Sequence, residues 1–315
     1  MTSRPKPTYI LTRLNHLRLK LRRPLFFHLI SVVSFCFALH LNIADARADF
    51  FNHPETISQP DAEPPSPIRW AHESADHAAR RALAKSRNFY RHPHQREGDV
   101  YSSRTPISAI EPDHIASWPE TLSLQSAFES IRNERFLLDE NRPDFLRRIS
   151  WLYPDDGCYV RAELMSEKLQ TLGFPAPTKL FVFGDLVAKT RFSPEGEVRW
   201  WYHVVVAYRL RDYLMVFDPA VHSTGPLEMT EWLGRIGADN DSTASICDAA
   251  AVSPNSICMG ATPSTPEATA QNEARFLRSE WRRMNELELI PENVLGEQPP
   301  WLPNQIPMNV SSFKH

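Results

Sequence analysis

The sequence predicts an α+β fold in which one helix packs on a small antiparallel sheet. Apolar residues repeat with helical spacing up to Leu172 and with the alternating spacing of strands between Lys179 and Phe217. Only Arg211-Asp212 separates the last two predicted strands, and so short a connection joins antiparallel strands. The fold class follows from this change of period and from the closeness of the strands.

Length, composition and charge limit the classes of protein to which the chain can belong. Its 315 residues suffice for one domain with extensions or for two small domains. With 42% apolar and 23% charged residues, the composition is that of a soluble globular protein. A formal charge of -3 excludes the strongly basic surface of a nucleic-acid-binding protein, so we expect no nucleic-acid partner.

The N-terminus has the pattern of a secretory signal peptide. Residues 1–23 carry seven basic and no acidic side chains, residues 25–41 are almost entirely apolar, and Ala46-Arg47-Ala48 offers a cleavage site before Asp49. A retained membrane anchor is the alternative, but the apolar run is short for a span and contains two histidines. We expect residues 1–48 to be removed and the mature protein to be secreted or periplasmic, with no membrane attachment.

Cysteine usage follows from export. Loss of Cys36 with the signal peptide leaves three cysteines, and an odd number in an oxidising compartment leaves one thiol unpaired within the chain. Cys247 and Cys258 are close in sequence and flanked by residues typical of loops, which predicts a disulfide between them. Cys158 is then the free thiol.

The segment 49–115 is polar and rich in proline, without a sustained strand pattern, although residues 71–89 are expected to form a helix. We predict an N-terminal extension over 49–115, a catalytic domain over 116–290 and a proline-rich tail over 291–315. Five histidines near the N-terminus show no recognisable set of metal ligands, so a solvated polar segment is favoured over a metal site; they are His72, His77, His92, His94 and His114.

Helices are expected around the free thiol and after it. Residues 122–138 have an amphipathic pattern, and a short helix is expected after Pro143, since proline suits a first helical turn. Asp155-Asp156-Gly157 is a capping signal for a helix over 158–172, which Gly173 ends. Further helices are expected over 230–236 and 268–289.

Strands are expected between these helices. They comprise residues 179–183, with a turn or bulge at Gly184-Asp185, then 199–210 and 213–217. The last strand ends at Asp218-Pro219, because proline cannot donate to a sheet ladder.

Cys158 is expected in the first helical turn, where unpaired backbone N–H groups and the helix dipole favour a thiolate and could hold an oxyanion. Asp155 and Asp156 oppose the thiolate unless they point away as caps. His203 lies in a strand. With a two-residue turn, position 205 faces Asp218 and His203 lies one diagonal step away on the same sheet face. A three-residue loop would place the pair on opposite faces.

Each of these residues has a structural alternative. A lone buried cysteine or a histidine in a strand is more often part of the core, and an aspartate before proline usually belongs to a turn. His222, in the loop after Asp218, is a rival base. Spacing alone therefore leaves the catalytic interpretation open.

Five separated blocks carry a resemblance to a known family. In chain order they are GCYVRA (157–162), FVFGDL (181–186), WWYHV (200–204), FDP (217–219) and STGP (223–226), followed by Trp232. This stretch resembles the bacterial secreted protein-glutaminases. The chain departs from the family pattern at Glu163, where histidine is typical, and its mature form is poorer in cysteines than the best-known members.

The resemblance implies a papain-like or transglutaminase-like core, with Cys158 as nucleophile, His203 as general acid and base, and Asp218 as the residue that orients the imidazole. It further implies a monomer that deamidates exposed glutamine in proteins or peptides without a cofactor or metal. It makes residues 49–115 a candidate propeptide. A transglutaminase, a papain-like peptidase and a non-catalytic secreted binding or effector protein remain the alternatives.

Overall fold

The computed structural model describes residues 64–86, 98–139 and 142–302. The chain divides into two units, 1–59 and 60–315, and all of the described residues belong to the second. The predicted signal peptide and Cys36 lie outside the described residues. Within the described ranges, no helix is both long enough and apolar enough to cross a membrane.

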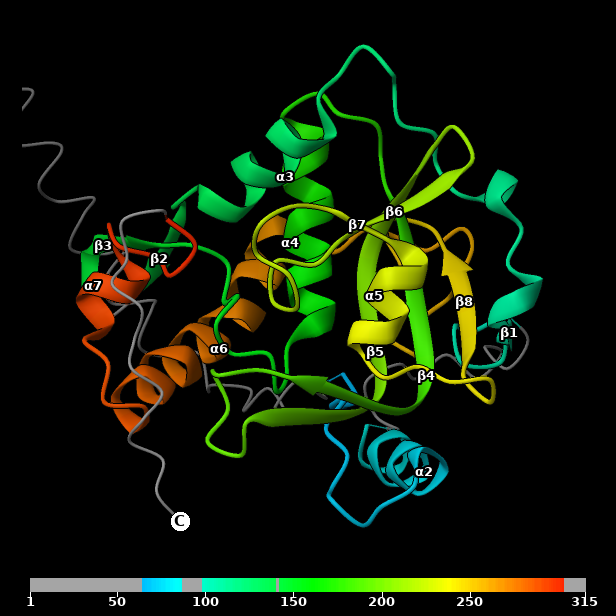
Figure 1. The fold of residues 1–315 in the computed structure, drawn as a ribbon, viewed down its shortest axis with the longest axis horizontal. Coiled ribbons are helices and arrows are strands. Elements are labelled where there is room, and N and C mark those ends of the chain that lie inside the picture. The colour runs from blue at the N-terminus through cyan, green and yellow to red at the C-terminus, as the bar shows by residue number, and fades with distance from the viewer. Residues whose placement is uncertain (1–63, 87–97, 140–141, 303–315) are drawn as a thin grey trace, which may run out of the picture. The chain divides into compact units, whose positions relative to one another are not determined.

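A six-stranded antiparallel sheet forms the centre of the second unit (Figure 1). Its long strands β4 and β5 are neighbours and contribute side chains to both apolar clusters of the core. In spatial order the strands are β1 (Thr105–Pro106), β8 (Thr243–Cys247), β4 (Thr178–Lys189), β5 (Glu197–Leu210), β6 (Tyr213–Phe217) and β7 (Leu227–Glu228). With the helices around it, this sheet confirms a mixed fold of helices and antiparallel strands.

Helices bury both faces of the sheet. One apolar cluster lies between the sheet and α4 (Cys158–Thr171), and includes residues of α3 (Leu124–Asn133) and α6 (Pro266–Glu286). A second cluster lies on the other face and includes Trp232 of α5 (Met229–Arg235). Two further α-helices are α2 (Ala75–Lys85), which lies against β4 and β5, and α7 (Pro291–Leu295), which lies beside α6.

The helix that begins at Cys158 has the bounds that the sequence predicts to within one residue. Its N-terminal neighbour Gly157 has φ of 79°, in the left-handed region that favours glycine. A Cβ at this position would lie 2.8 Å from Cγ of Phe276 in α6. Glycine therefore permits both the sharp entry into α4 and the close approach of α6.

The hairpin between β5 and β6 has the predicted register. Val206 pairs with Phe217 and Leu210 with Tyr213, so Arg211-Asp212 forms a two-residue turn in which Arg211 has φ of 55°. Strand β4 is also irregular between Phe183 and Leu186, as expected of a bulge at Gly184-Asp185, and then continues to Lys189.

Two expectations on the N-terminal side of Cys158 are wrong. The helix predicted over 122–138 ends at Asn133, and Leu137–Asp139 is strand β2. Arg142–Arg147 is strand β3, paired with β2, where a helix was expected after Pro143. Proline is compatible with an edge strand. Tertiary contacts decide the outcome, because the buried Arg147 forms an ion pair of 2.6 Å with Glu280 of α6.

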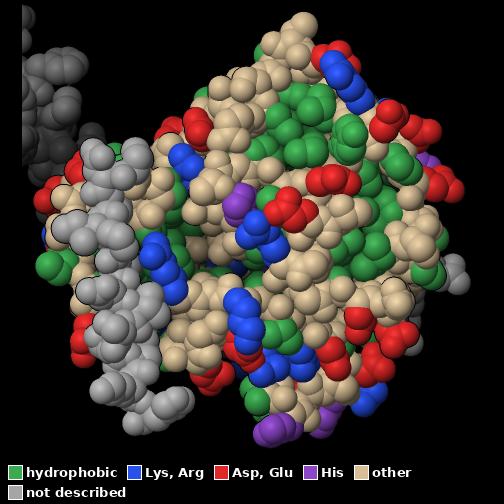
Figure 2. All heavy atoms as spheres, in the orientation of Figure 1, with side chains coloured by type: hydrophobic (Ala, Val, Ile, Leu, Met, Phe, Trp, Pro, Cys, Tyr) green, Lys and Arg blue, Asp and Glu red, His purple; other side chains and the backbone are tan. Residues whose placement is uncertain are grey.

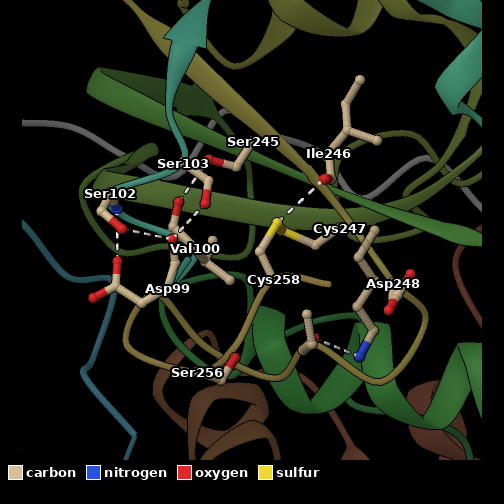
Figure 3. The surroundings of a disulfide bond; sticks show 12 residues. Asp99, Val100, Ser102, Ser103, Ser245, Ile246, Cys247, Asp248, Ser256 and Cys258 are labelled. Atoms are coloured by element: carbon tan, nitrogen blue, oxygen red, sulfur yellow. Dashed lines mark hydrogen bonds between the residues drawn. A yellow bond between two sulfur atoms is a disulfide. The ribbon is translucent and has the colours of Figure 1, made fainter. Parts of the chain in front are cut away.

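The predicted disulfide between Cys247 and Cys258 is present (Figure 3). Cys158 is the free cysteine of the described ranges. The disulfide loop holds the segment that precedes β1, since the backbone N–H of Val100 donates to the carbonyl of Ser256, and Ser245 Oγ donates to the carbonyl of Val100. Described parts of the predicted extension therefore pack on the sheet. The domain boundaries at 115 and 290 stay predictions.

Candidate active site

Cys158 is the first residue of α4 and is only 1% exposed. Burial raises the pKa of its thiol to about 12, although the positive charge of Arg161 and a hydrogen bond from the Val204 backbone lower it. The charges of Asp156 and Asp218 act in the same direction as burial. In this form of the protein the thiol is neutral at pH 7 and hence a weak nucleophile.

The loop before Cys158 is held by its carbonyl groups. Arg161 Nη1 donates to the carbonyls of Tyr153 at 3.0 Å and Asp156 at 2.6 Å. Trp200 Nε1 lies 3.1 Å from the two carbonyls between them, those of Pro154 and Asp155. Four successive carbonyls are thus bound by two buried side chains, which fixes the start of α4.

The acidic pair before Cys158 behaves in part as expected. Asp155 points to α6, where it pairs with Arg283 at 2.8 Å. Asp156 accepts a hydrogen bond of 2.6 Å from the backbone N–H of Gly157, and Gly157 itself occupies the N-cap position. Asp156 is half-buried, and desolvation raises the pKa of its carboxyl group. Its charge therefore still acts on the Cys158 thiol.

His203 and Asp218 meet across β5 and the end of β6. Nε2 of His203 lies 2.8 Å from Oδ2 of Asp218, and both side chains are buried. Burial alone would raise the pKa of Asp218, but the charge and hydrogen bond of His203 and the indole N–H of Trp232 outweigh it and leave the pKa below its usual value. Because an ionised carboxylate only accepts hydrogen bonds, the proton of this contact belongs to Nε2.

The other imidazole nitrogen of His203, Nδ1, is available as a hydrogen-bond acceptor. Nδ1 of His203 is buried and has no hydrogen-bond partner among the described residues. With Nε2 protonated, Nδ1 of a neutral ring is an acceptor. The thiol of Cys158 contacts the backbone of Val204, the next residue along β5, and responds to the charge of Asp218. The three residues singled out from the sequence therefore lie in one buried region.

His222, the rival base, is not part of this group. Its Nε2 lies 2.6 Å from Oγ1 of Thr224, and its backbone N–H donates to the carbonyl of Asp218. Burial lowers the pKa of its imidazole. It belongs to the loop that follows Asp218, while His203 holds the carboxylate.

The described sequence from 64 to 69 lies over the same region. The hydroxyl of Tyr202 donates to the carbonyl of Pro65 at 2.8 Å and also interacts with the Cys158 thiol. Ser66 Oγ donates to Oδ2 of Asp156 at 2.8 Å, and the indole N–H of Trp201 donates to the carbonyl of Ser66. These contacts place an extended, proline-rich segment beside the start of α4.

Comparison with known proteins identifies the part of the chain that holds these residues. Residues 124–236 match a family described as glutaminase. This segment is similar to the glutaminase family. It includes Cys158, His203 and Asp218, together with α3, α4, α5 and the strands β2 to β7. No curated protein matches the sequence.

Solved structures of protein-glutaminases are also similar to the chain. They include a pro-protein-glutaminase (26% identity, 46% of this chain and 54% of that one, TM-score 0.32), a protein-glutaminase (23%, 62% and 97%, 0.37) and the protein-glutaminase of Chryseobacterium proteolyticum (26%, 41% and 73%, 0.32). The chain spans about half the length of the pro-protein-glutaminase. TM-scores this low do not establish a common fold.

Four side chains around Cys158, His203 and Asp218 were not singled out as functional from the sequence. Tyr202 contacts the thiol and Arg161 holds the loop before it, while Trp200 and Trp232 contact His203. Their positions in the quoted sequence blocks were the available signal. Contacts of this kind depend on tertiary structure, so periodicity did not distinguish these residues from ordinary core positions.

The described residues contain no group of three or more His, Cys, Asp or Glu side chains arranged to hold a metal ion.

Basic side chains are unevenly distributed on the surface. On the face drawn in Figure 2, Lys and Arg side chains gather around a hollow near the middle of the molecule, although the formal charge of the chain is -3.

Proposed function

We propose that this protein is an exported protein-glutaminase with a papain-like or transglutaminase-like core, which hydrolyses the side-chain amide of glutamine in proteins or peptides. The observation that carries the proposal is the glutaminase match over 124–236, which spans both the free buried cysteine and the His203–Asp218 pair. The predicted signal peptide supports export, and the disulfide is of a kind that persists in oxidising compartments.

The proposed reaction begins with proton transfer from Cys158 to Nδ1 of His203. The thiolate sulfur then bonds to the amide carbon of glutamine, and the carbonyl oxygen takes up the negative charge, near the backbone N–H of Cys158 at the start of α4. The imidazolium returns its proton to the leaving nitrogen as the C–N bond breaks, and ammonia departs from a thioester.

Hydrolysis of the thioester completes the cycle. His203 takes a proton from water, the resulting hydroxide adds to the thioester carbon, and the C–S bond breaks to give glutamate and the Cys158 thiolate. Asp218 keeps Nε2 protonated in both halves of the reaction, so that Nδ1 always exchanges protons with the reacting groups. All of these roles come from side chains and backbone, without a cofactor.

The N-terminal extension has a place in this proposal as a propeptide. Residues 65–67 contact Tyr202, Trp201 and Asp156, which surround the start of α4. A segment held there leaves Cys158 buried and neutral and obstructs a substrate. We propose that its release exposes the thiol, which regains solvation and acquires a lower pKa.

The experiment that tests the function is mass spectrometry of a broad peptide pool after incubation with the protein, before and after limited proteolysis. Deamidation adds about one mass unit at glutamine without chain cleavage, by the exchange of –NH₂ for –OH that the thioester route produces. Cys158→Ala should abolish this gain. Cross-linking to an added amine would instead indicate a transglutaminase, new N-termini a peptidase, and no change of any kind a non-catalytic protein.

A further inference from the structure

Two tryptophan rings stack against the His203 imidazole. Trp200, three residues before it on β5, stacks at a centroid distance of 4.3 Å with an interplanar angle of 10°. Trp232 of α5 stacks at 5.9 Å and 29°. Both tryptophans are fully buried. Stacking of this kind restricts the tilt of a ring as well as adding contact energy.

Each tryptophan also has a polar contact that belongs to the site. The indole N–H of Trp232 donates to Oδ2 of Asp218 at 2.9 Å, the same oxygen that His203 contacts at 2.8 Å. This oxygen is thus fixed by two donors from different elements, α5 and β5. The carboxylate cannot turn away from His203 without losing the contact with Trp232.

The indole N–H of Trp200 points to the other half of the site. It lies 3.1 Å from the carbonyls of Pro154 and Asp155, in the loop that leads into α4. One side chain therefore touches both the imidazole and the backbone that positions the nucleophile. A change in the placement of this indole alters the position of His203 relative to Cys158.

The imidazole needs this support because its hydrogen bonds fix one end only. Nε2 is held by Asp218, while Nδ1 has no partner among the described residues. A ring held at one nitrogen can still tilt about that contact, and a tilt moves Nδ1 relative to the thiol. Misplacement of a reacting group by about 1 Å can cost roughly 100-fold in rate.

We propose that Trp200 and Trp232 are positioning residues that hold the His203 ring in place, with the proton on Nε2 directed to Asp218 and Nδ1 toward Cys158. This inference rests on the proposed function for its kinetic consequence. Its structural part, the tautomer and orientation of His203, stands without a substrate.

The test uses the full chain, treated by limited proteolysis before the kinetic measurements, and the variant Trp232→Phe, which keeps an aromatic ring beside His203 and removes the indole N–H. The matched control is Trp118→Phe, because Trp118 is also buried and its indole N–H also makes a hydrogen bond of 2.9 Å, but to the carbonyl of Leu122. Nitrogen NMR of protein with ¹⁵N-labelled histidine reports the tautomer, and the spectrum of His203→Gln assigns the resonances.

We expect the wild type and Trp118→Phe to hold neutral His203 as the Nε2–H tautomer, and Trp232→Phe to show a mixture of tautomers. On a glutamine peptide, we expect kcat of Trp232→Phe to fall by about 10- to 100-fold, with KM changed by less than about twofold, because positioning acts on the transition state. Trp200→Phe should also lower kcat, with a larger effect on the reactivity of the Cys158 thiol.

An unchanged tautomer in Trp232→Phe, or a kcat equal to that of Trp118→Phe, overturns the proposal. If Trp232→Phe does not fold, Trp200→Phe with the same two measurements decides. A wild-type protein that shows the Nε2–H tautomer but releases no ammonia from any glutamine peptide, even after limited proteolysis, would contradict the proposed function and leave the placement of His203 intact, so the two failures are distinguishable.

Discussion

The hydroxyl of Tyr202 donates a hydrogen bond of 2.8 Å to the carbonyl of Pro65 and interacts at the same time with the thiol of Cys158. One residue of β5 thus joins the N-terminal segment to the proposed nucleophile. We therefore expect the protonation of the thiol to depend on whether residues 65–67 are in place.

The first prediction concerns the reactivity of this thiol. Because burial raises the pKa of Cys158 to about 12, the intact chain should react slowly with iodoacetamide at pH 7.5. Limited proteolysis that removes the N-terminal segment should accelerate alkylation by roughly 100-fold or more, since thiolate rather than thiol is the nucleophile. Labelling is measured by mass spectrometry, with Cys158→Ala as the control for other sites. Equal rates before and after proteolysis would contradict the covering role of the segment.

The second prediction concerns the pH dependence of stability. Glu273 of α6 is fully buried; burial raises the pKa of its carboxyl group to about 7, while a hydrogen bond from the backbone N–H of Ser150 and the charge of Arg161 lower it. In the unfolded chain the value returns to its usual range near 4.3. The folded state therefore binds the proton more tightly, and its stability falls as pH rises from the unfolded value through 7.

Glu273→Gln removes this titration and keeps an acceptor for the Ser150 N–H. We expect it to stabilise the protein at pH 8, by up to about 3 kcal/mol from a shift of this size, and to change stability little at pH 4. Urea unfolding at both pH values is the measurement. A stabilisation that is equal at pH 4 and pH 8 would show that ionisation of Glu273 is not its cause.

Part of the fold and of the candidate site can be predicted from the sequence alone. The period change after Gly173 and the turn at Arg211-Asp212 predict α4, β5, β6 and the hairpin register, because local spacing determines them. The short strands β2 and β3 were missed, since the contact of Arg147 with Glu280 joins segments more than a hundred residues apart. The carboxylate of Asp218 could be paired with His203 from strand register, but its second donor, Trp232, comes from α5 through tertiary packing.

The third prediction concerns the entry into the helix of Cys158. Gly157→Ala should destabilise the protein by about 2–4 kcal/mol, from the left-handed backbone and from overlap with the Phe276 ring, whose Cγ would lie 2.8 Å from the new Cβ. Gly196→Ala is the matched control, because Gly196 has φ of 71° and open space around an added Cβ. Gly196→Ala should destabilise the protein by only about 1–2 kcal/mol, because it adds the strain of the left-handed backbone without a steric overlap. Equal losses in urea unfolding would show that α6 does not constrain Gly157.

The fourth prediction concerns the buried ion pair beneath α4. Lys179 Nζ forms an ion pair with Glu163 and donates a hydrogen bond of 2.8 Å to the carbonyl of Ala251 in the disulfide loop. Both charged side chains are almost completely inaccessible to solvent. Burial lowers the pKa of Lys179 against the opposing effect of Glu163. Lys179→Met leaves the Glu163 carboxylate buried without this partner, and should destabilise the protein by about 3–5 kcal/mol.

The double variant Lys179→Met, Glu163→Leu separates two quantities. One is the net contribution of the ion pair to stability, and the other is the destabilisation caused by leaving one buried charge without its partner. Replacement of both charges by apolar side chains of similar volume is often neutral or stabilising, so the double variant should recover most of the loss. Urea unfolding of the wild type and of the two single variants and the double variant completes a thermodynamic cycle, in which the coupling between the two positions should exceed about 1 kcal/mol. If the losses of the single variants simply add, Glu163 and Lys179 act independently, and the link from the disulfide loop to the helix of Cys158 does not pass through their contact.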